Sequence, residues 1–242
     1  MHRFYITQKV KDDTAIVSDT AQFHHLKNVL RLKGGDEVTV CDREGNEFVC
    51  AILKLEKDRA VLAVKARRTI SIRKVGLTIA CAIPKQAKFD EIVDSLTQLG
   101  VERIIPMETE RVIVRLDDAR KAARLKRWRI IAQSAAAQSQ RNVVPAVEAI
   151  TTFENVLLHY NNFDLKLLPT LSGDRKHISE VLGKAEAHNI LVLIGPEGDF
   201  TPEEVELAQK AGFILVSLGE SVLRVGTAAI AIVSHIRLAS GG

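Results

Sequence analysis

The sequence predicts an α/β protein in which a mostly parallel sheet, with helices on both faces, follows a small β-barrel. Three observations predict this fold. From residue 75 onward, apolar runs of strand length alternate with helical patterns, as in parallel sheets covered by helices. Before that point the chain holds short β-prone runs separated by turn signals. Finally, 46% of the 242 residues are hydrophobic and 26% are charged, which is typical of a globular protein.

In the N-terminal part, turn signals separate three β-prone runs at residues 37–41, 47–55 and 60–64. One helical pattern, residues 19–32, precedes them. Short strands joined by tight turns suggest a small barrel, which we place at residues 1–70. The charged run at residues 65–74 is the predicted linker, so we place the second domain at residues 74–242.

In the C-terminal part, the alternation predicts strands at residues 75–83, 103–106, 165–168, 190–194 and 214–218. It predicts helices at residues 90–99, 117–139, 152–160, 178–187, from 201 and at 227–236. The last two strands each run into a turn that contains glycine. Ligands of open α/β sheets bind at such carboxyl ends of strands, so we expect the functional site there.

The loop after residues 190–194 reads Gly195-Pro196-Glu197-Gly198. Glycine lets backbone approach a ligand closely, and the negative charge favours a neutral or cationic ligand over an anion. No phosphate-loop or dinucleotide-binding motif follows any strand. The alternative is an ordinary tight turn with Glu197 in solvent. A second loop, residues 218–226, holds Arg224 in an apolar context.

Composition excludes several classes of protein. The formal net charge of +4 is compatible with a polyanionic partner but does not require one. The three cysteines show neither disulfide nor zinc-ligand spacing, so we expect buried thiols and no metal site. No run approaches the roughly 18 apolar residues of a membrane helix, and no signal peptide is evident. We therefore expect a cytoplasmic protein with no membrane contact.

A basic helix, residues 120–129, is a candidate for RNA binding. It holds six basic residues in ten positions, with Trp128 among them. Arg124 and Arg127 are its candidate RNA contacts. The alternative is a solvated helix face, which is the usual explanation of a charge run. Arg141, which follows the predicted helix in a Gln-Arg-Asn segment, is the stronger functional candidate.

Taken in order, the motifs resemble the SPOUT-class ribosomal RNA methyltransferases, and more narrowly the small-subunit ribosomal RNA uridine-N3 methyltransferase family. In the C-terminal part the resemblance rests on Leu193–Gly198, Leu218-Gly219, Val222–Arg224 and Thr227-Ala228. The central segments that match are Lys88, Leu99–Val101, Glu110-Arg111, Arg141-Asn142 and Val144-Pro145. Arg3-Phe4, His25-Leu26, Val29–Arg31 and Gly35-Asp36 resemble the family's PUA-like RNA-binding barrel.

The resemblance implies a C-terminal domain tied in a trefoil knot, with S-adenosylmethionine held by the knot loops. The residues that would line the cofactor are Leu168, Pro169, Ile194, Gly195, Pro196, Gly198, Leu218, Gly219, Val222 and Leu223. Candidate RNA contacts outside the basic helix are Arg3, His25, Arg31 and Arg111. The family acts as a homodimer, so Arg141 would face a site completed by the partner subunit. The substrate would be ribosomal RNA or the small ribosomal subunit.

The implied reaction transfers a methyl group from a sulfonium to N3 of a uracil. Arg141, with Arg224 nearby, would stabilise charge on the uracil oxygens. Glu197 would orient the base or move its proton.

Three positions where the family usually has an acid hold Gln98, Ala137 and Gly226. One alternative is therefore a catalytically weakened or inactive member that binds ribosomal RNA or the ribosome. Another is a nucleotide-binding enzyme of metabolism. Because the Gly195–Gly198 loop, Arg141 and Arg224 are present, an active methyltransferase is the preferred interpretation.

Overall fold

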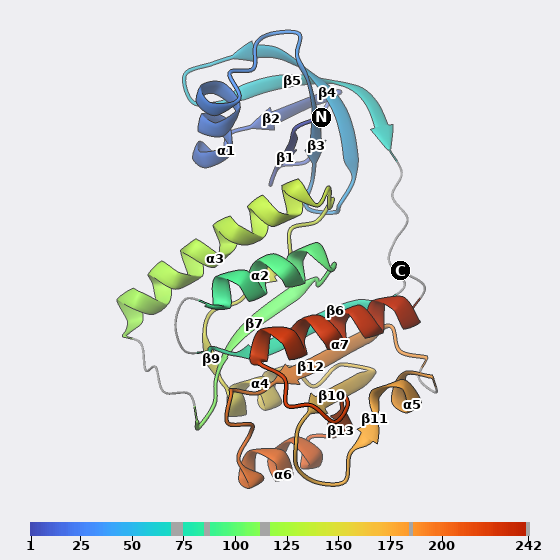
Figure 1. The fold of residues 1–242 in the computed structure, drawn as a ribbon. Coiled ribbons are helices and arrows are strands. Elements are labelled where there is room, and N and C mark those ends of the chain that lie inside the picture. The colour runs from blue at the N-terminus through green and yellow to red at the C-terminus, as the bar shows by residue number, and fades with distance from the viewer. Residues whose placement is uncertain (69–74, 85–87, 112–116, 184–185, 241–242) are drawn as a thin grey trace. The chain divides into compact units, whose positions relative to one another are not determined.

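The computed structural model describes residues 1–68, 75–84, 88–111, 117–183 and 186–240 (Figure 1). The chain divides into two compact units. The N-terminal unit comprises Met1–Ile72 and Ala136–Val144, and the C-terminal unit comprises Arg73–Ala135 and Pro145–Gly242. Arg141 therefore belongs to the N-terminal unit.

The N-terminal unit is built on a five-stranded mixed sheet with the order β1-β3-β4-β5-β2. Its strands are β1 (Arg3–Tyr5), β2 (Thr14–Val17), β3 (Glu37–Cys41), β4 (Glu47–Leu55) and β5 (Ala60–Arg68). The core between the sheet and helix α1 (Thr20–His24) includes Phe4, Leu26, Val38 and Leu62. The helix begins at Asp19, whose side chain accepts a hydrogen bond from the amide of Gln22, and continues as a π-helical turn, η1 (His25–Val29).

Two predicted strands of this unit, at residues 37–41 and 47–55, are confirmed. The predicted linker is wrong at its start, because Lys65–Arg68 continue β5 and pair with β4 as far as Glu47 and Phe48. Residues 69–74 lie outside the described residues. Strands β1 and β2 were not predicted, since three or four residues are too few to show an alternating pattern.

The C-terminal unit is built on a parallel sheet with the order β11-β13-β10-β12-β6-β7-β8, and β9 also pairs with β7. The strands are β6 (Gly76–Ala82), β7 (Arg103–Glu108), β8 (Ala146–Val147), β9 (Thr151–Thr152), β10 (Leu165–Pro169), β11 (Lys176–His177), β12 (Asn189–Ile194) and β13 (Ile214–Ser217). All five predicted strands are confirmed. The two-residue strands β8, β9 and β11 were missed.

Helices cover both faces of this sheet, as predicted (Figure 1). They are α2 (Phe89–Gln98), α3 (Asp118–Gln138), α4 (Phe153–His159), α5 (Ile178–Leu182), α6 (Pro202–Lys210) and α7 (Val225–Ala239). Helices α2 and α7 pack against each other on one face, whereas α4 and α6 share a core with the strands on the other. Helix α5 ends earlier than predicted. In the described ranges, no helix has the length and apolarity needed to cross a membrane.

Arg237, near the end of α7, is a buried charge that anchors this helix to the sheet. Its guanidinium donates to the carbonyl oxygens of Val75, at 2.6 Å, and Gly100, and it pairs with Glu102 at 2.9 Å. These acceptors lie just before β6 and β7, at the amino edge of the sheet. The start of α7 and the loop before it are thereby directed to the opposite, carboxyl edge.

Candidate functional site

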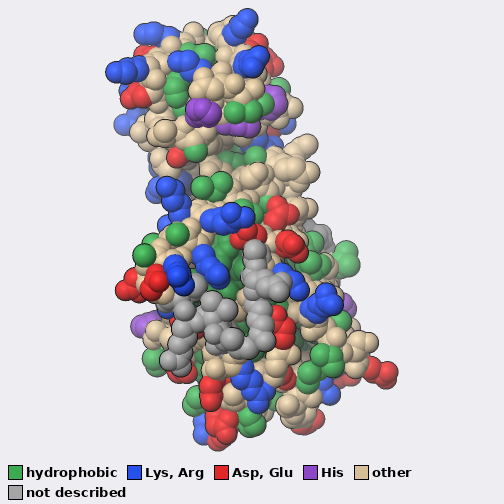
Figure 2. All heavy atoms as spheres, turned by 60° about the vertical axis from the view of Figure 1, so that its left-hand side comes forward, with side chains coloured by type: hydrophobic (Ala, Val, Ile, Leu, Met, Phe, Trp, Pro, Cys, Tyr) green, Lys and Arg blue, Asp and Glu red, His purple; other side chains and the backbone are tan. Residues whose placement is uncertain are grey.

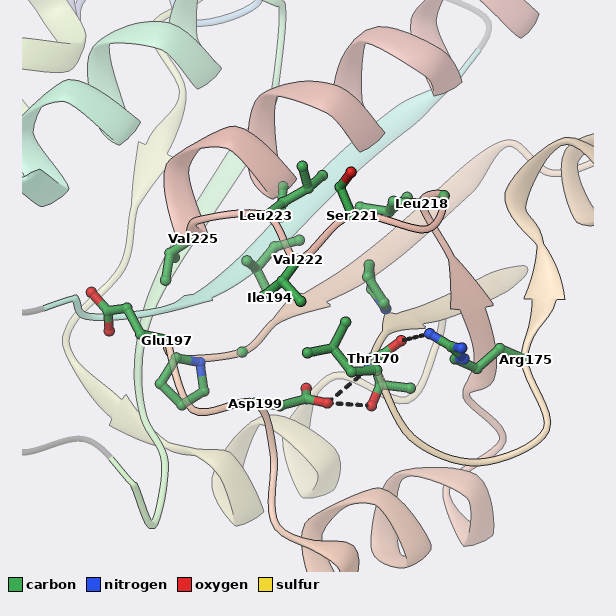
Figure 3. A pocket seen from close by; sticks show the side chains of 16 residues that line it. Thr170, Arg175, Ile194, Glu197, Asp199, Leu218, Ser221, Val222, Leu223 and Val225 are labelled. Carbon is green, nitrogen blue, oxygen red and sulfur yellow. Dashed lines mark hydrogen bonds between the residues drawn. The ribbon is translucent and has the colours of Figure 1, made fainter.

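Three loops line a pocket at the carboxyl edge of the parallel sheet (Figure 3). They follow β10, β12 and β13, which are neighbours in the sheet although they are distant in sequence. Because these strands are parallel, their carboxyl ends meet at one edge.

Most of the predicted cofactor residues line this pocket. Eight of the ten do so: Pro169, Ile194, Gly195, Pro196, Leu218, Gly219, Val222 and Leu223. Glu197 also lines it. Leu168 is instead fully buried in the core of the sheet. Gly198 is directed towards Arg111, whose Cδ would lie 3.6 Å from an added Cβ.

The pocket walls are apolar on the side of the last loop. Figure 3 shows Ile194, Val222 and Leu223 close together, beneath the start of α7. Val222 is 71% exposed, which is unusual for a valine of a packed core but expected for one that faces a ligand. Among the described residues, the backbone amides of Val222 and Leu223 have no hydrogen-bond partner in the protein. This wall therefore offers both apolar surface and free backbone donors.

Asp199 joins two of the three loops by hydrogen bonds. It was not among the residues predicted from the sequence. Its Oδ2 accepts hydrogen bonds from the Thr170 hydroxyl and the Leu171 amide, each at 2.8 Å (Figure 3). Its backbone is left-handed, with φ of 59°, and its amide donates to the carbonyl of Pro196 at 3.0 Å. Thr170, Leu171, Arg175, Ser221, Val225 and Ala228 are further lining residues that the sequence did not indicate.

Arg111, predicted to contact RNA, is engaged with the loop after β12. Its guanidinium donates to the carbonyl oxygens of Gly198, of Asp199 at 3.4 Å and of Phe200 at 3.3 Å. The neighbouring amide of Glu110 donates to Glu204, in the first turn of α6, at 3.0 Å. The segment after β7 thus supports the pocket loop.

Two glycines of the pocket are required by geometry. A Cβ on Gly195 would lie 2.9 Å from the ring of Phe200, which is itself buried. Gly219 has a φ of 115°, which side chains rarely allow. Both loops therefore depend on glycine to adopt the conformation that encloses the pocket.

The three predicted catalytic residues are not all at the pocket. Glu197 lies at its edge (Figure 3). Burial, and secondarily the charge of Glu197, raises the pKa of the Cys81 thiol in β6. Arg224 is exposed and immediately precedes α7, but it does not line the pocket. Arg141 belongs to the N-terminal unit.

The basic helix is only partly a solvated face. Trp128 is buried, so its ring is not available to stack on a nucleobase. Its ring packs on Phe89 at 4.5 Å, and its indole nitrogen donates to Asp90 at 3.0 Å. Arg127 pairs with the same carboxylate at 2.6 Å. Arg124 is half-buried.

The candidate RNA contacts of the N-terminal unit differ in exposure. The side chain of Arg3 is 9% exposed and pairs with Glu47 at 3.0 Å. His25 and Arg31, in and after η1, are exposed. Figure 2 shows Lys and Arg side chains around the surface of this unit, with histidines among them.

None of the three cysteines lines the pocket. The three cysteines are buried free thiols, as expected, and burial raises the pKa of Cys41 and of Cys50 to about 11. Across the part of the chain that the structure describes, no group of three or more His, Cys, Asp and Glu side chains could hold a metal ion.

Comparison with known proteins gives matches over nearly the whole chain. Residues 72–237 match the family described as RNA methyltransferase domain, and residues 17–65 match RNA methyltransferase PUA domain. The ribosomal RNA small subunit methyltransferase E of Bacillus subtilis is 29% identical, over 98% of this chain and 96% of its own length. That of Mesomycoplasma hyopneumoniae is 30% identical, over 95% and 96%. The crystal structure of the Neisseria gonorrhoeae protein of that name, bound to S-adenosyl methionine, superposes with a TM-score of 0.83, at 30% identity, over 98% of this chain and 97% of that one.

Proposed function

The chain belongs to the RNA methyltransferase family with a PUA domain, and on that premise we propose that it methylates N3 of a uridine in small-subunit ribosomal RNA. S-adenosylmethionine is the methyl donor. The fold class predicted from the sequence, a SPOUT α/β domain after a PUA-like domain, is confirmed. The observation that carries the proposal is the pocket formed by the loops after β10, β12 and β13, in a chain similar to these methyltransferases over nearly its full length.

The pocket residues fit S-adenosylmethionine. Apolar side chains such as Ile194 and Leu223 suit the faces of an adenine ring, and free backbone amides suit its edge. Glu197 and Asp199 bring negative charge, which suits a ligand that carries a sulfonium and an ammonium group. The bound cofactor supplies an electrophilic methyl group.

The protein's own residues would prepare the uracil. N3 of uracil is a nucleophile only after it loses its proton, and the resulting negative charge spreads to the ring oxygens. The guanidinium of Arg141 would stabilise that charge, with Arg224 as the second candidate. Glu197 would accept the N3 proton or pass it to water. We propose that the protein acts as a homodimer in which the partner subunit completes this arrangement around Arg141.

We also propose that the two domains have different roles. Residues 1–70 would bind RNA, with His25 and Arg31 as exposed contacts, and residues 74–242 would carry methyl transfer. Arg124 and Arg127 would add electrostatic attraction for phosphates from α3.

An inactive RNA-binding member is the second candidate, because three acids usual in the family are absent. None of the three positions lines the pocket. Gln98 is exposed at the end of α2, and Ala137 is half-buried near the end of α3. A Cβ added at Gly226, in the first turn of α7, would lie 3.5 Å from Ile92. Their substitution leaves the pocket intact, which favours the active enzyme.

The decisive experiment combines mass spectrometry of ribosomal RNA nucleosides with a reconstituted reaction. Cells that lack the gene should lose one N3-methyluridine, and purified protein with S-adenosylmethionine should restore it on small subunits or naked RNA from those cells. Arg141→Ala should abolish transfer while calorimetry still detects cofactor binding. Arg59→Ala, at an exposed arginine paired with Glu56, is the control. Methylation of another atom, or RNA binding without any cofactor binding, would overturn the proposal.

A further inference from the structure

Tyr5 holds the backbone of Arg141 within the N-terminal unit. The hydroxyl of Tyr5, in β1, donates a 2.6 Å hydrogen bond to the carbonyl oxygen of Arg141. The two residues are 136 positions apart in sequence. Burial raises the pKa of the Tyr5 phenol well above its ordinary value, so the hydroxyl keeps the proton that it donates.

The other side of Arg141 is held by the end of α3. Its amide donates to the carbonyl of Ala136 at 2.9 Å, and the amide of Gln140 donates to Ala137 at 3.3 Å. Gln140 has a φ of 56°, so these bonds form the Schellman arrangement that closes many helices. That conformation is usually given to glycine, because a side chain there is strained. The amide and the carbonyl of Arg141 are thus both fixed.

The next residue is fixed by β1 as well. The Asn142 side-chain oxygen accepts a hydrogen bond from the guanidinium of Arg3. Arg3 is in turn paired with Glu47 at 3.0 Å, and the side chains of that pair are 9% and 8% exposed. Strand β1 therefore makes two separate contacts with the segment that carries Arg141.

We infer that Tyr5 is a positioning residue for Arg141, so that the N-terminal unit sets the place of a catalytic side chain besides binding RNA. This inference rests on the proposed function, in which the guanidinium of Arg141 acts on the uracil. A guanidinium stabilises a developing charge only from the correct place, and a displacement of 1 Å can lower a rate by about 100-fold. The hydrogen bond from Tyr5 is one of the restraints on the backbone of Arg141, so its removal should lower the rate by less than about 100-fold.

The test is Tyr5→Phe, which removes only the hydroxyl. The kcat for methyl transfer should fall about tenfold, while KM for the RNA and the affinity for S-adenosylmethionine stay unchanged. Tyr160→Phe is the matched control, because Tyr160 is the only other tyrosine and is also half-buried. In the described part of the chain its hydroxyl has no hydrogen-bond partner, so this variant should keep the wild-type kcat.

Rates are referred to the concentration of cofactor-binding sites, measured by titration, so that partial unfolding does not imitate a lower kcat. An unchanged kcat in Tyr5→Phe would overturn the inference, and so would a rise in KM for the RNA at constant kcat. If Arg141→Ala alone is fully active, the role proposed for Arg141 fails. If Arg141→Ala is inactive and Tyr5→Phe is normal, only the positioning inference fails.

Discussion

The carboxylate of Asp199 accepts a 2.8 Å hydrogen bond from the hydroxyl of Thr170, and this bond joins two loops of the cofactor pocket. The same carboxylate oxygen accepts a second bond, from the amide of Leu171, also at 2.8 Å. Asp199 belongs to the loop after β12, whereas Thr170 and Leu171 directly follow β10. One carboxylate therefore determines how these two walls of the pocket meet.

Asp199→Asn should weaken the binding of S-adenosylmethionine about tenfold, because hydrogen bonds to a charged acceptor are stronger than those to a neutral one. Asparagine tolerates the left-handed backbone at this position, so the effect isolates the lost charge. Calorimetry measures the affinity. Asp164→Asn is the control, since Asp164 also accepts two backbone hydrogen bonds at 2.8 Å, but at the amino end of β12. Equal cofactor affinities in the two variants would contradict the role of Asp199.

Gly195→Ala should destabilise the protein by about 1–3 kcal/mol, because the new methyl group would overlap the ring of Phe200. That ring cannot move aside easily, since it is 2% exposed and packs on Phe153 at 5.6 Å. Gly198→Ala is the matched control, because its Cβ would make only an ordinary contact at 3.6 Å. Urea unfolding of both variants measures the difference, and equal stabilities would show that the loop adapts to a side chain at residue 195.

Glu47→Ala should destabilise the N-terminal unit by about 3–5 kcal/mol, because it leaves the guanidinium of Arg3 buried without its ion pair. Glu47 is 6% exposed and also pairs with Arg68 at 2.9 Å. Thermal or urea unfolding measures the loss. Glu44→Ala is the control, because Glu44 pairs with Lys9 on the surface and should make no measurable contribution. Similar losses of stability in the two variants would show that burial of the ion pair does not determine its contribution.

Much of the fold and of the site could be predicted because it depends on local pattern. Two of the three strands that carry the pocket, β12 and β13, are apolar runs that lead into turns with glycine, so Ile194, Gly195 and Gly219 could be placed at one edge of the sheet. The fastening of that edge could not be predicted, since Asp199 and Thr170 are 29 positions apart and neither lies in a distinctive motif. The knot is implied by the family resemblance and not by periodicity.

Several tertiary contacts were not expected, and for one physical reason: a basic or aromatic residue type does not reveal its partner. Trp128 and Arg127 belong to a basic run, but both are bound to Asp90, nearly forty positions earlier. Arg3 was predicted to contact RNA, and in the structure its guanidinium pairs with Glu47 and donates a hydrogen bond to Asn142. The guanidinium of Arg111 donates hydrogen bonds to the backbone carbonyl oxygens of residues 198–200. Only the tertiary structure shows which arginines have such partners.

Arg31→Gln should weaken RNA binding and lower the slope of log affinity against log salt by about one, because a phosphate contact releases about one counterion. Arg31, which follows η1, is exposed, and among the described residues it has no ion pair. Arg59→Gln is the matched control in the same unit, because Arg59 is paired with Glu56 at 2.6 Å. Binding of small-subunit RNA at several salt concentrations measures both slopes. Equal slopes for the two variants would remove Arg31 from the RNA-binding surface.

Asp164 should make the stability of the C-terminal unit depend on pH in the acid range. The amides of Asn189 and His188 donate to its carboxylate and lower its pKa below the ordinary value. The folded form therefore gains stability from this group above the ordinary carboxyl pKa of about 3.9 and loses it as the pH falls through the lower, folded-state pKa. Asp164→Asn should thus have a lower urea midpoint than the wild type at pH 7, and the difference should shrink as the pH is lowered below about 4. A difference that stays constant with pH would show that the charge of Asp164 does not contribute, because the asparagine would then differ only in hydrogen bonding.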